Sequence, residues 1–156
     1  MSVLVAGVGN VFFSDDGFGP QVAQVLAREP QADARVEDFG IRGLHLAYEL
    51  LAGYDRAILV DAVARGATPG TLFVIEPDRD APHGTPDAHR MDVENVLSYL
   101  SLLGGEAPPI TLVGCEPATT EPGMGLSPPV TRAVDAAAAL IRRMIASPGG
   151  VACSDR

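Results

Sequence analysis

The chain begins with the sequence MSVLVAGVGNVFFSDDGFG (residues 1–19), in which an apolar run leads into a loop rich in glycine and aspartate. Residues 3–6 are all apolar, which is typical of a strand that is buried on both faces of a sheet. Residues 17–28 then carry apolar side chains at helical spacing. This opening therefore predicts a buried strand at residues 1–7, a loop, and a helix.

Strands and helices are predicted to alternate along the rest of the chain. The further strands are expected at residues 34–39, 56–61, 71–76 and 109–115, and the further helices at 42–51, 91–103 and 128–146. Strand 71–76 follows its predecessor after only nine residues, which is short for a parallel crossover of about a dozen residues. We therefore expect a three-layer α/β/α sandwich around a mostly parallel five-stranded sheet, with strand 71–76 as the candidate for antiparallel pairing.

Length and composition indicate one domain at residues 1–146, followed by a frayed tail at 147–156. All 11 basic residues are arginine, which excludes chemistry that needs a lysine. The net charge of -9 argues against a nucleic-acid partner, because phosphate binding needs basic side chains. No apolar run approaches the roughly 20 residues that span a bilayer, and the amino terminus lacks a signal pattern. We therefore expect no membrane association and a cytoplasmic location.

Three aspartates follow predicted strands, at the sheet edge where ligands bind in this class of fold. Asp16 lies in the loop after the first strand, Asp38 ends the second and Asp61 ends the third. Asp15 stands beside Asp16, and either could cap the next helix, which stabilises it by about 1 kcal/mol. Since capping needs only one of the two, the other is predicted to face a site.

Glycine and histidine positions refine this prediction. Gly17 and Gly19 would let a bulky partner approach the backbone next to Asp16. His89 directly precedes a predicted helix whose amino terminus could be directed towards the same edge, whereas His45 and His83 are expected to be structural and solvated, respectively.

The set of Asp16, Asp61 and His89 offers oxygen and nitrogen donors suited to a divalent metal ion with open positions. The two cysteines, Cys115 and Cys153, lack the spacing of a metal site or a disulfide scaffold and are expected to be inert.

Nucleotide-binding signatures fit the glycine-rich loop Gly7–Gly19 poorly. Phe12 replaces the third glycine of a dinucleotide-binding motif, and a P-loop needs a lysine that the chain lacks. A nucleotide or phosphate binder that uses this loop in another way remains an alternative hypothesis.

Several motifs together resemble the hydrogenase maturation endopeptidases over residues 1–146. They are Gly7-Val-Gly-Asn10, Asp15-Asp16-Gly17-Phe-Gly19, Asp38-Phe-Gly40, Asp61-Ala-Val, His89 before a helix, Val113-Gly-Cys-Glu-Pro117 and Gly125-Leu-Ser127-Pro128. The resemblance implies an endopeptidase that removes a carboxyl-terminal extension from the large-subunit precursor of a nickel-iron hydrogenase after nickel insertion. A non-catalytic module that binds the same precursor is the alternative.

The resemblance also implies roles for single residues. The family's metal-binding positions map onto Asp16, Asp61 and His89, and the nickel would be supplied by the precursor, with no permanently bound cofactor. Several relatives carry glutamate at the first position, so with Asp16 the metal must lie closer or the loop must shift. Asp16 and Asp38 are the candidate catalytic carboxylates. The candidate substrate-binding residues are Gly9, Asn10 and Gly40.

Overall fold

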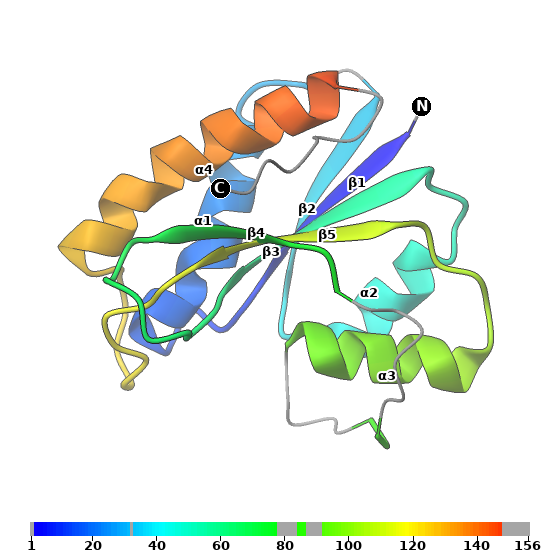
Figure 1. The fold of residues 1–156 in the computed structure, drawn as a ribbon, viewed down its shortest axis with the longest axis horizontal. Helices are drawn as coiled ribbons and strands as arrows, with labels where there is room; N and C mark the ends of the chain where they lie inside the picture. Colours follow the sequence, from blue (N-terminus) through cyan, green and yellow to red (C-terminus); the bar gives the residue numbers. More distant parts are fainter. Residues whose placement is uncertain (1, 32, 78–83, 87–91, 148–156) are drawn as a thin grey trace.

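The central sheet is built from the apolar strands that the sequence predicts, and Figure 1 shows it almost edge-on between two layers of helices. The computed structural model describes residues 2–31, 33–77, 84–86 and 92–147. The strands are β1 (Val3–Val8), β2 (Ala34–Gly40), β3 (Arg56–Ala62), β4 (Leu72–Ile75) and β5 (Ile110–Cys115). Their order across the sheet is β2-β1-β3-β5-β4. Only the β4–β5 pair is antiparallel among these strands, which confirms both the mostly parallel sheet and the antiparallel candidate.

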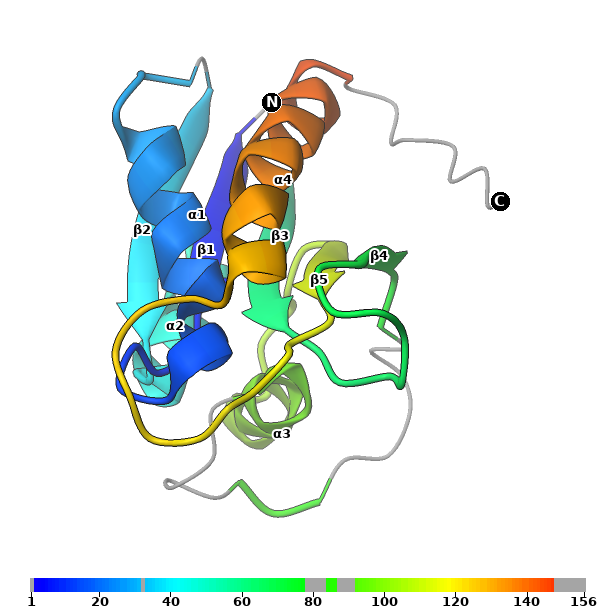
Figure 2. The same cartoon turned by 90° about the vertical axis from the view of Figure 1, so that its left-hand side faces the viewer.

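Helices cover both faces of the sheet. They are the short 3-10 helix η1 (Ser14–Gly17), α1 (Phe18–Ala27), α2 (Gly43–Leu50), α3 (Val93–Leu103) and α4 (Pro128–Ala146). Figure 2 shows α1 and α4 on one side of the strands, with α2 and α3 on the other. The predicted three-layer sandwich is therefore confirmed. None of the described helices is long and apolar enough to cross a membrane.

Strand β1 divides its side chains between the two helical layers because neighbouring residues of a strand point to opposite faces. All six of its residues are buried. Val3 and Val5 pack with α1 and α4, whereas Leu4 and Ala6 pack with α2 and α3. The continuous apolar run of β1 thus contributes to both cores.

The start of α3 differs from the sequence-based expectation, and the start of α4 lacks a side-chain cap. Helix α3 begins at Val93 rather than residue 91, because Asp92 is its N-cap and accepts a hydrogen bond of 2.8 Å from the Asn95 amide. Ser127 holds the N-cap position of α4, but its hydroxyl makes no capping bond. Residue 91 and residues 148–156 of the expected tail lie outside the described ranges.

Glycines place α1 unusually close to the sheet. A Cβ atom on Gly19 would stand 2.1 Å from the Val60 carbonyl oxygen and 2.3 Å from that of Val8, and one on Gly7 would meet the Gly19 carbonyl at 2.4 Å. A Cβ on Gly17 would lie 3.2 Å from the Val11 Cα. The expectation that Gly19 leaves room for an outside partner is therefore wrong, since the chain's own backbone fills that space.

We expect Gly19→Ala to lower the free energy of unfolding by about 3 kcal/mol or more, because the added methyl collides with two backbone carbonyls. Alanine otherwise favours a helix by about 1 kcal/mol over glycine, so the sign of the change is diagnostic. Urea denaturation measures the effect. Gly84→Ala is the control, since open space surrounds that position. Equal stability of Gly19→Ala and the wild type would contradict the close contact.

Candidate active site

The connection between β1 and α1, residues 9–17, folds back over the end of β1. Gly9 has a φ of 141°, and a Cβ there would stand 2.0 Å from the Asp16 carbonyl oxygen. The Gly9 amide donates to the Gly40 carbonyl at 3.0 Å, and the Gly40 amide donates to Asp38 Oδ1 at 2.8 Å. The loops after β1 and β2 are therefore joined at the carboxyl edge of the sheet.

Asn10 sets the position of Asp16 within this connection. The Asn10 amide donates to Asp16 Oδ2 at 2.7 Å, and Asn10 Oδ1 accepts from the Phe12 amide at 2.9 Å. The Asn10 carbonyl accepts from the Phe13 amide at 3.1 Å. One asparagine thus both shapes the turn and holds the neighbouring carboxylate.

The amides of this connection are already used inside the chain. Those of Gly9, Asn10 and residues 12–16 all donate to backbone or side-chain oxygens of the protein itself. A phosphate site of the nucleotide-binding kind needs a row of amides that are available to the ligand. The geometry therefore disfavours the nucleotide or phosphate hypothesis.

Asp15 joins η1 to the β5–α4 loop (residues 116–127), which Figure 2 shows in yellow passing beside η1. Its fully buried carboxylate accepts four hydrogen bonds, from the amides of Ala118, Thr119 and Ser127 and from the Ser127 hydroxyl, at 2.8, 3.2, 2.7 and 2.8 Å. Burial acts to raise the pKa of Asp15, but these bonds outweigh it and the pKa lies below the ordinary value. Asp15 thus anchors η1 to the β5–α4 loop and does not cap α1.

We expect Asp15→Asn to lower the free energy of unfolding by about 2 kcal/mol or more at neutral pH, because an amide cannot accept from all four donors. The folded-state pKa of Asp15 is depressed, so its contribution is present at neutral pH and disappears as the pH falls through that pKa. Urea denaturation against pH tests both statements. Asp135→Asn, an exposed change on α4, is the control, and equal losses in the two variants would contradict the assignment.

Asp61 and Asp16 form a pair of carboxylates at the end of β3. Asp61 is 4% exposed, and its Oδ1 accepts from the Ala62 amide at 2.8 Å. Burial, and then the negative charge of Asp16, raise the pKa of Asp61 well above its ordinary value. Burial also raises the pKa of Asp16, against the hydrogen bond from Asn10. The structure therefore brings two of the three predicted metal-binding residues together.

Asp92 is a functional candidate that the sequence reasoning missed. It caps α3 through Asn95, and its charge adds to the rise in the pKa of Asp61, so its carboxylate lies near the pair. The signal was present in the sequence, because Asp92 stands directly before a helical apolar pattern.

Asp38 reaches the same edge of the sheet on the other face. It pairs in register with Gly7, which pairs with Val60, the residue before Asp61. Strand alternation therefore directs Asp38 towards the α1 and α4 layer and Asp61 towards α2 and α3. Asp38 Oδ1 also accepts from the Gly40 amide, so the structure gives Asp38 a local role in shaping the loop after β2.

His89 lies outside the residues that the structure describes, and so do His83 and Cys153. Within the described ranges, no three His, Cys, Asp or Glu side chains are grouped so that they could hold a metal ion. His45 lies in α2, is exposed, and stacks edge-on against Phe39 at 5.5 Å between ring centroids. Cys115 is buried, and its pKa is raised to about 11 chiefly by that burial, which agrees with an inert thiol.

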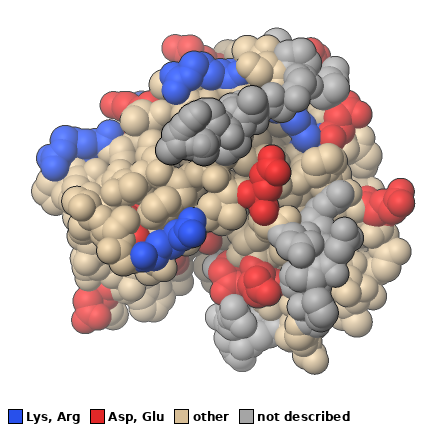
Figure 3. Space-filling model, in the orientation of Figure 1, with Lys and Arg blue, Asp and Glu red and all other residues tan. Residues whose placement is uncertain are grey.

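In the space-filling view the molecule is indented between the half that carries α4 and the half that carries α3, on the side where the parallel strands end (Figure 3). Glu116, a second buried carboxylate beyond the predicted set, holds the turn after β3 by accepting from the amides of Arg65 and Ala67 at 2.8 and 3.1 Å. The edge around Asp61 is therefore built from fixed loops.

We expect Asp61→Asn to raise the free energy of unfolding at pH 7 by on the order of 1 kcal/mol, because burial and the charge of Asp16 disfavour ionisation of Asp61 in the folded protein, and an amide does not ionise. The pKa of Asp61 is raised on folding, so the wild type loses stability as the pH rises from about 4 through the folded-state pKa. The advantage of the variant should therefore shrink as the pH is lowered to 4.

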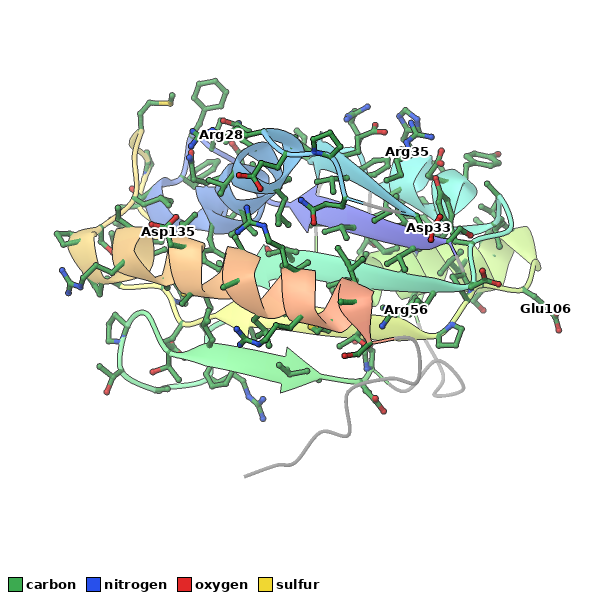
Figure 4. The ribbon with its side chains drawn as sticks, turned by 90° about the horizontal axis from the view of Figure 1, so that it is seen from above. Arg28, Asp33, Arg35, Arg56, Glu106 and Asp135 are labelled. Atoms are coloured by element: carbon green, nitrogen blue, oxygen red, sulfur yellow. The ribbon has the colours of Figure 1, made fainter. Side chains whose placement is uncertain are left out.

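Urea denaturation between pH 4 and pH 8 measures this difference. Glu106→Gln is the matched control, because it removes one negative charge from an exposed side chain that projects from the far end of the molecule (Figure 4). An Asp61→Asn variant that is less stable than the wild type at pH 7 would show that the carboxylate pair is not repulsive.

Comparisons with known proteins show which family the chain resembles in sequence and fold. A family model described as hydrogenase maturation protease matches residues 20–144. The chain is 33% identical over 161 residues to hydrogenase expression/formation protein HupD of Rhizobium leguminosarum bv. viciae, with 99% of this chain and 78% of that protein covered. It is 32% identical over 143 residues to the hydrogenase 2 maturation protease of Escherichia coli K12, with 88% and 86% covered.

A solved structure shares the fold. The crystal structure of a hydrogenase 2 maturation peptidase from a Thaumarchaeota archaeon matches with a TM-score of 0.73 and 29% identity, over 94% of this chain and 99% of that chain. The chain therefore belongs to the hydrogenase maturation protease family. It is an endopeptidase with a processing role in hydrogenase maturation, and this membership disfavours the non-catalytic binding module.

Proposed function

We propose that this endopeptidase removes the carboxyl-terminal extension of a nickel-iron hydrogenase large-subunit precursor after nickel insertion, and that Asp16, Asp61 and His89 recognise the inserted nickel. The observation that carries the proposal is that Asp61, which is buried, and Asp16, which is partly buried, lie together at the end of β3, where burial raises the pKa of both carboxyl groups. The ion pairs of Arg35 and Arg42 are with Glu37 and Glu49, so these two described cations do not neutralise Asp16 or Asp61.

A buried carboxylate without a cation either binds a proton or attracts a positive ion. A divalent ion that arrives at Asp61 would displace the proton and turn the repulsion between the two carboxylates into a shared attraction. Carboxylate oxygens and an imidazole nitrogen are donors that nickel accepts. The nickel would belong to the substrate, and no permanently bound cofactor forms part of the proposal.

The same arrangement supports peptide hydrolysis. The nickel would polarise the scissile carbonyl or activate a water molecule, and a carboxylate would accept the proton as that water attacks. Asp16 is the proposed base because it is only partly buried, whereas Asp61 is almost completely buried. Asp38 is the proposed alternative, from the opposite face of the same edge.

Gly9, Asn10 and Gly40 would contribute to substrate binding through the shape of their loops. The amides of all three donate to oxygens of the protein itself. Positive φ angles at Gly9 and Gly40 keep the backbone of both loops close to the edge of the sheet. The precursor would therefore meet a preformed surface with Asp16 at its centre.

We expect Asp16→Asn, Asp61→Asn and His89→Ala each to lower kcat/KM for processing of nickel-loaded precursor by about 100-fold or more, because each removes one donor to the nickel. Mass spectrometry of the shortened precursor and the released peptide measures processing, and circular dichroism checks folding. Precursor without nickel should stay uncleaved by the wild type. Glu106→Gln is the control and should process normally.

Two results would overturn the proposal in different ways. A nickel-loaded precursor that stays full-length with the wild-type protein would remove the cleavage reaction. Unchanged processing in two of the three site variants would remove the metal-recognition role while leaving cleavage in place.

A further inference from the structure

We infer that the groove between α1 and α4, together with the exposed apolar side chains of residues 11–13 and 124, binds an uncharged apolar segment of the hydrogenase precursor outside the cleavage site. The inference rests on the proposed function, since it names a second region through which the same substrate is held.

The groove has a volume of about 610 Å³, enough for a few residues of a peptide. Gln21, Gln24 and Val25 line it from α1, and Leu126, Thr131 and Val134 line it from the other side. Its two charged lining residues are Arg28 and Asp135, which Figure 4 labels. The remaining surface combines apolar groups with side-chain amides, which can bond the N–H and C=O groups of a peptide backbone.

Exposed apolar side chains are concentrated in the two segments that reach this groove, residues 11–13 and residue 124. Val11, Phe12, Phe13 and Met124 are 36%, 63%, 41% and 71% exposed, and they make up half of the eight large apolar residues that are exposed in the described chain. Val11 and Met124 also line the groove. A cluster of this kind is typical of a surface that another molecule covers.

The two segments that carry these side chains are tied together. The Gly123 amide donates to the Phe12 carbonyl at 2.8 Å, and the Ser14 amide donates to the Gly123 carbonyl at 2.8 Å. The Ser14 hydroxyl donates to the Glu121 carbonyl at 2.7 Å. The two apolar segments are therefore held in a fixed shape, which lowers the entropy cost of binding.

Continuity with the Asp16 loop identifies the occupant. Phe12 and Phe13 lie between Asn10 and Asp16 in the same short connection, so a protein that presents its metal to Asp16 comes within reach of both rings. Between residues 9 and 20 the charged residues are Asp15, which is fully buried, and Asp16. The surface beside Asp16 therefore suits an apolar, uncharged part of the precursor.

The test compares the double variant Phe12→Ser/Met124→Ser with Leu102→Ser. Leu102 is 71% exposed, like Met124, but lies near the carboxyl end of α3 in the other helical layer. Titration calorimetry measures the Kd for precursor with and without nickel, and processing assays give kcat and KM. Urea midpoints verify that the exposed substitutions leave folding intact.

We expect the double variant to raise Kd and KM by about tenfold or more, with kcat at saturating precursor within about twofold of the wild type. Leu102→Ser should leave all values unchanged. The loss should also appear with nickel-free precursor, because the groove would bind peptide rather than metal. A Kd of the double variant within about twofold of the wild type would overturn the inference.

Asp16→Asn separates this inference from the proposed function. It should abolish cleavage while retaining the Phe12- and Met124-dependent binding of nickel-free precursor. Loss of cleavage in Asp16→Asn, together with a Kd and KM of the double variant within about twofold of the wild type, would overturn the docking groove and leave the proposed function standing. The other possible occupant of the groove is a second copy of the chain, and analytical sedimentation tests for it. A dimer that the double variant loses, with an unchanged Kd for precursor, would assign the groove to that second copy and overturn the inference.

Discussion

The backbone-to-backbone contact between the start of α1 and the ends of β1 and β3 positions the rest of the site. The carbonyl oxygens of Val8 and Val60 occupy the place of a side chain at Gly19. This contact sets how closely η1 can lie over the sheet, and the next residue of β3 after Val60 is Asp61. The distance between the Asp16 carboxylate of η1 and the Asp61 carboxylate of β3 therefore depends on the absence of a methyl group at Gly19.

Neighbouring residues of η1 have opposite electrostatic surroundings. Asp15 is surrounded by hydrogen-bond donors that favour its charged form, and its pKa falls. Asp16 is partly buried beside Asp61, and the pKa of both rises. The fold thus satisfies one carboxylate completely and leaves the other in an unfavourable environment. Retained electrostatic conflict of this kind is typical of a functional site rather than of a structural one.

Patterns within a short stretch of sequence predicted most of the fold. Continuous apolar runs located β1 and β3, and the short connection before β4 pointed to its antiparallel pairing. Strand alternation would also have placed Asp38 on the face opposite to Asp61, because Asp38 lies two residues after the apolar Val36 and so points to the same face as Val36.

Contacts between residues that are far apart in the chain could not be predicted from the sequence. Asp15 meets Ala118 across 103 residues, and no local pattern indicates that it would bond there rather than cap a helix. Gly19 was misread for the same reason, because its neighbours come from β3 and β1.

The first turn of α4 shows why Ser127 is available to Asp15. A helix normally needs an oxygen at its N-cap because its first amides lack partners. Here Pro128 and Pro129 occupy the first two positions of the helix and have no amide hydrogen to satisfy. The double proline therefore leaves fewer amides for the serine hydroxyl to cap, and the hydroxyl instead donates to the Asp15 carboxylate of η1. Two imino acids on one element thus govern how firmly a carboxylate on another is anchored.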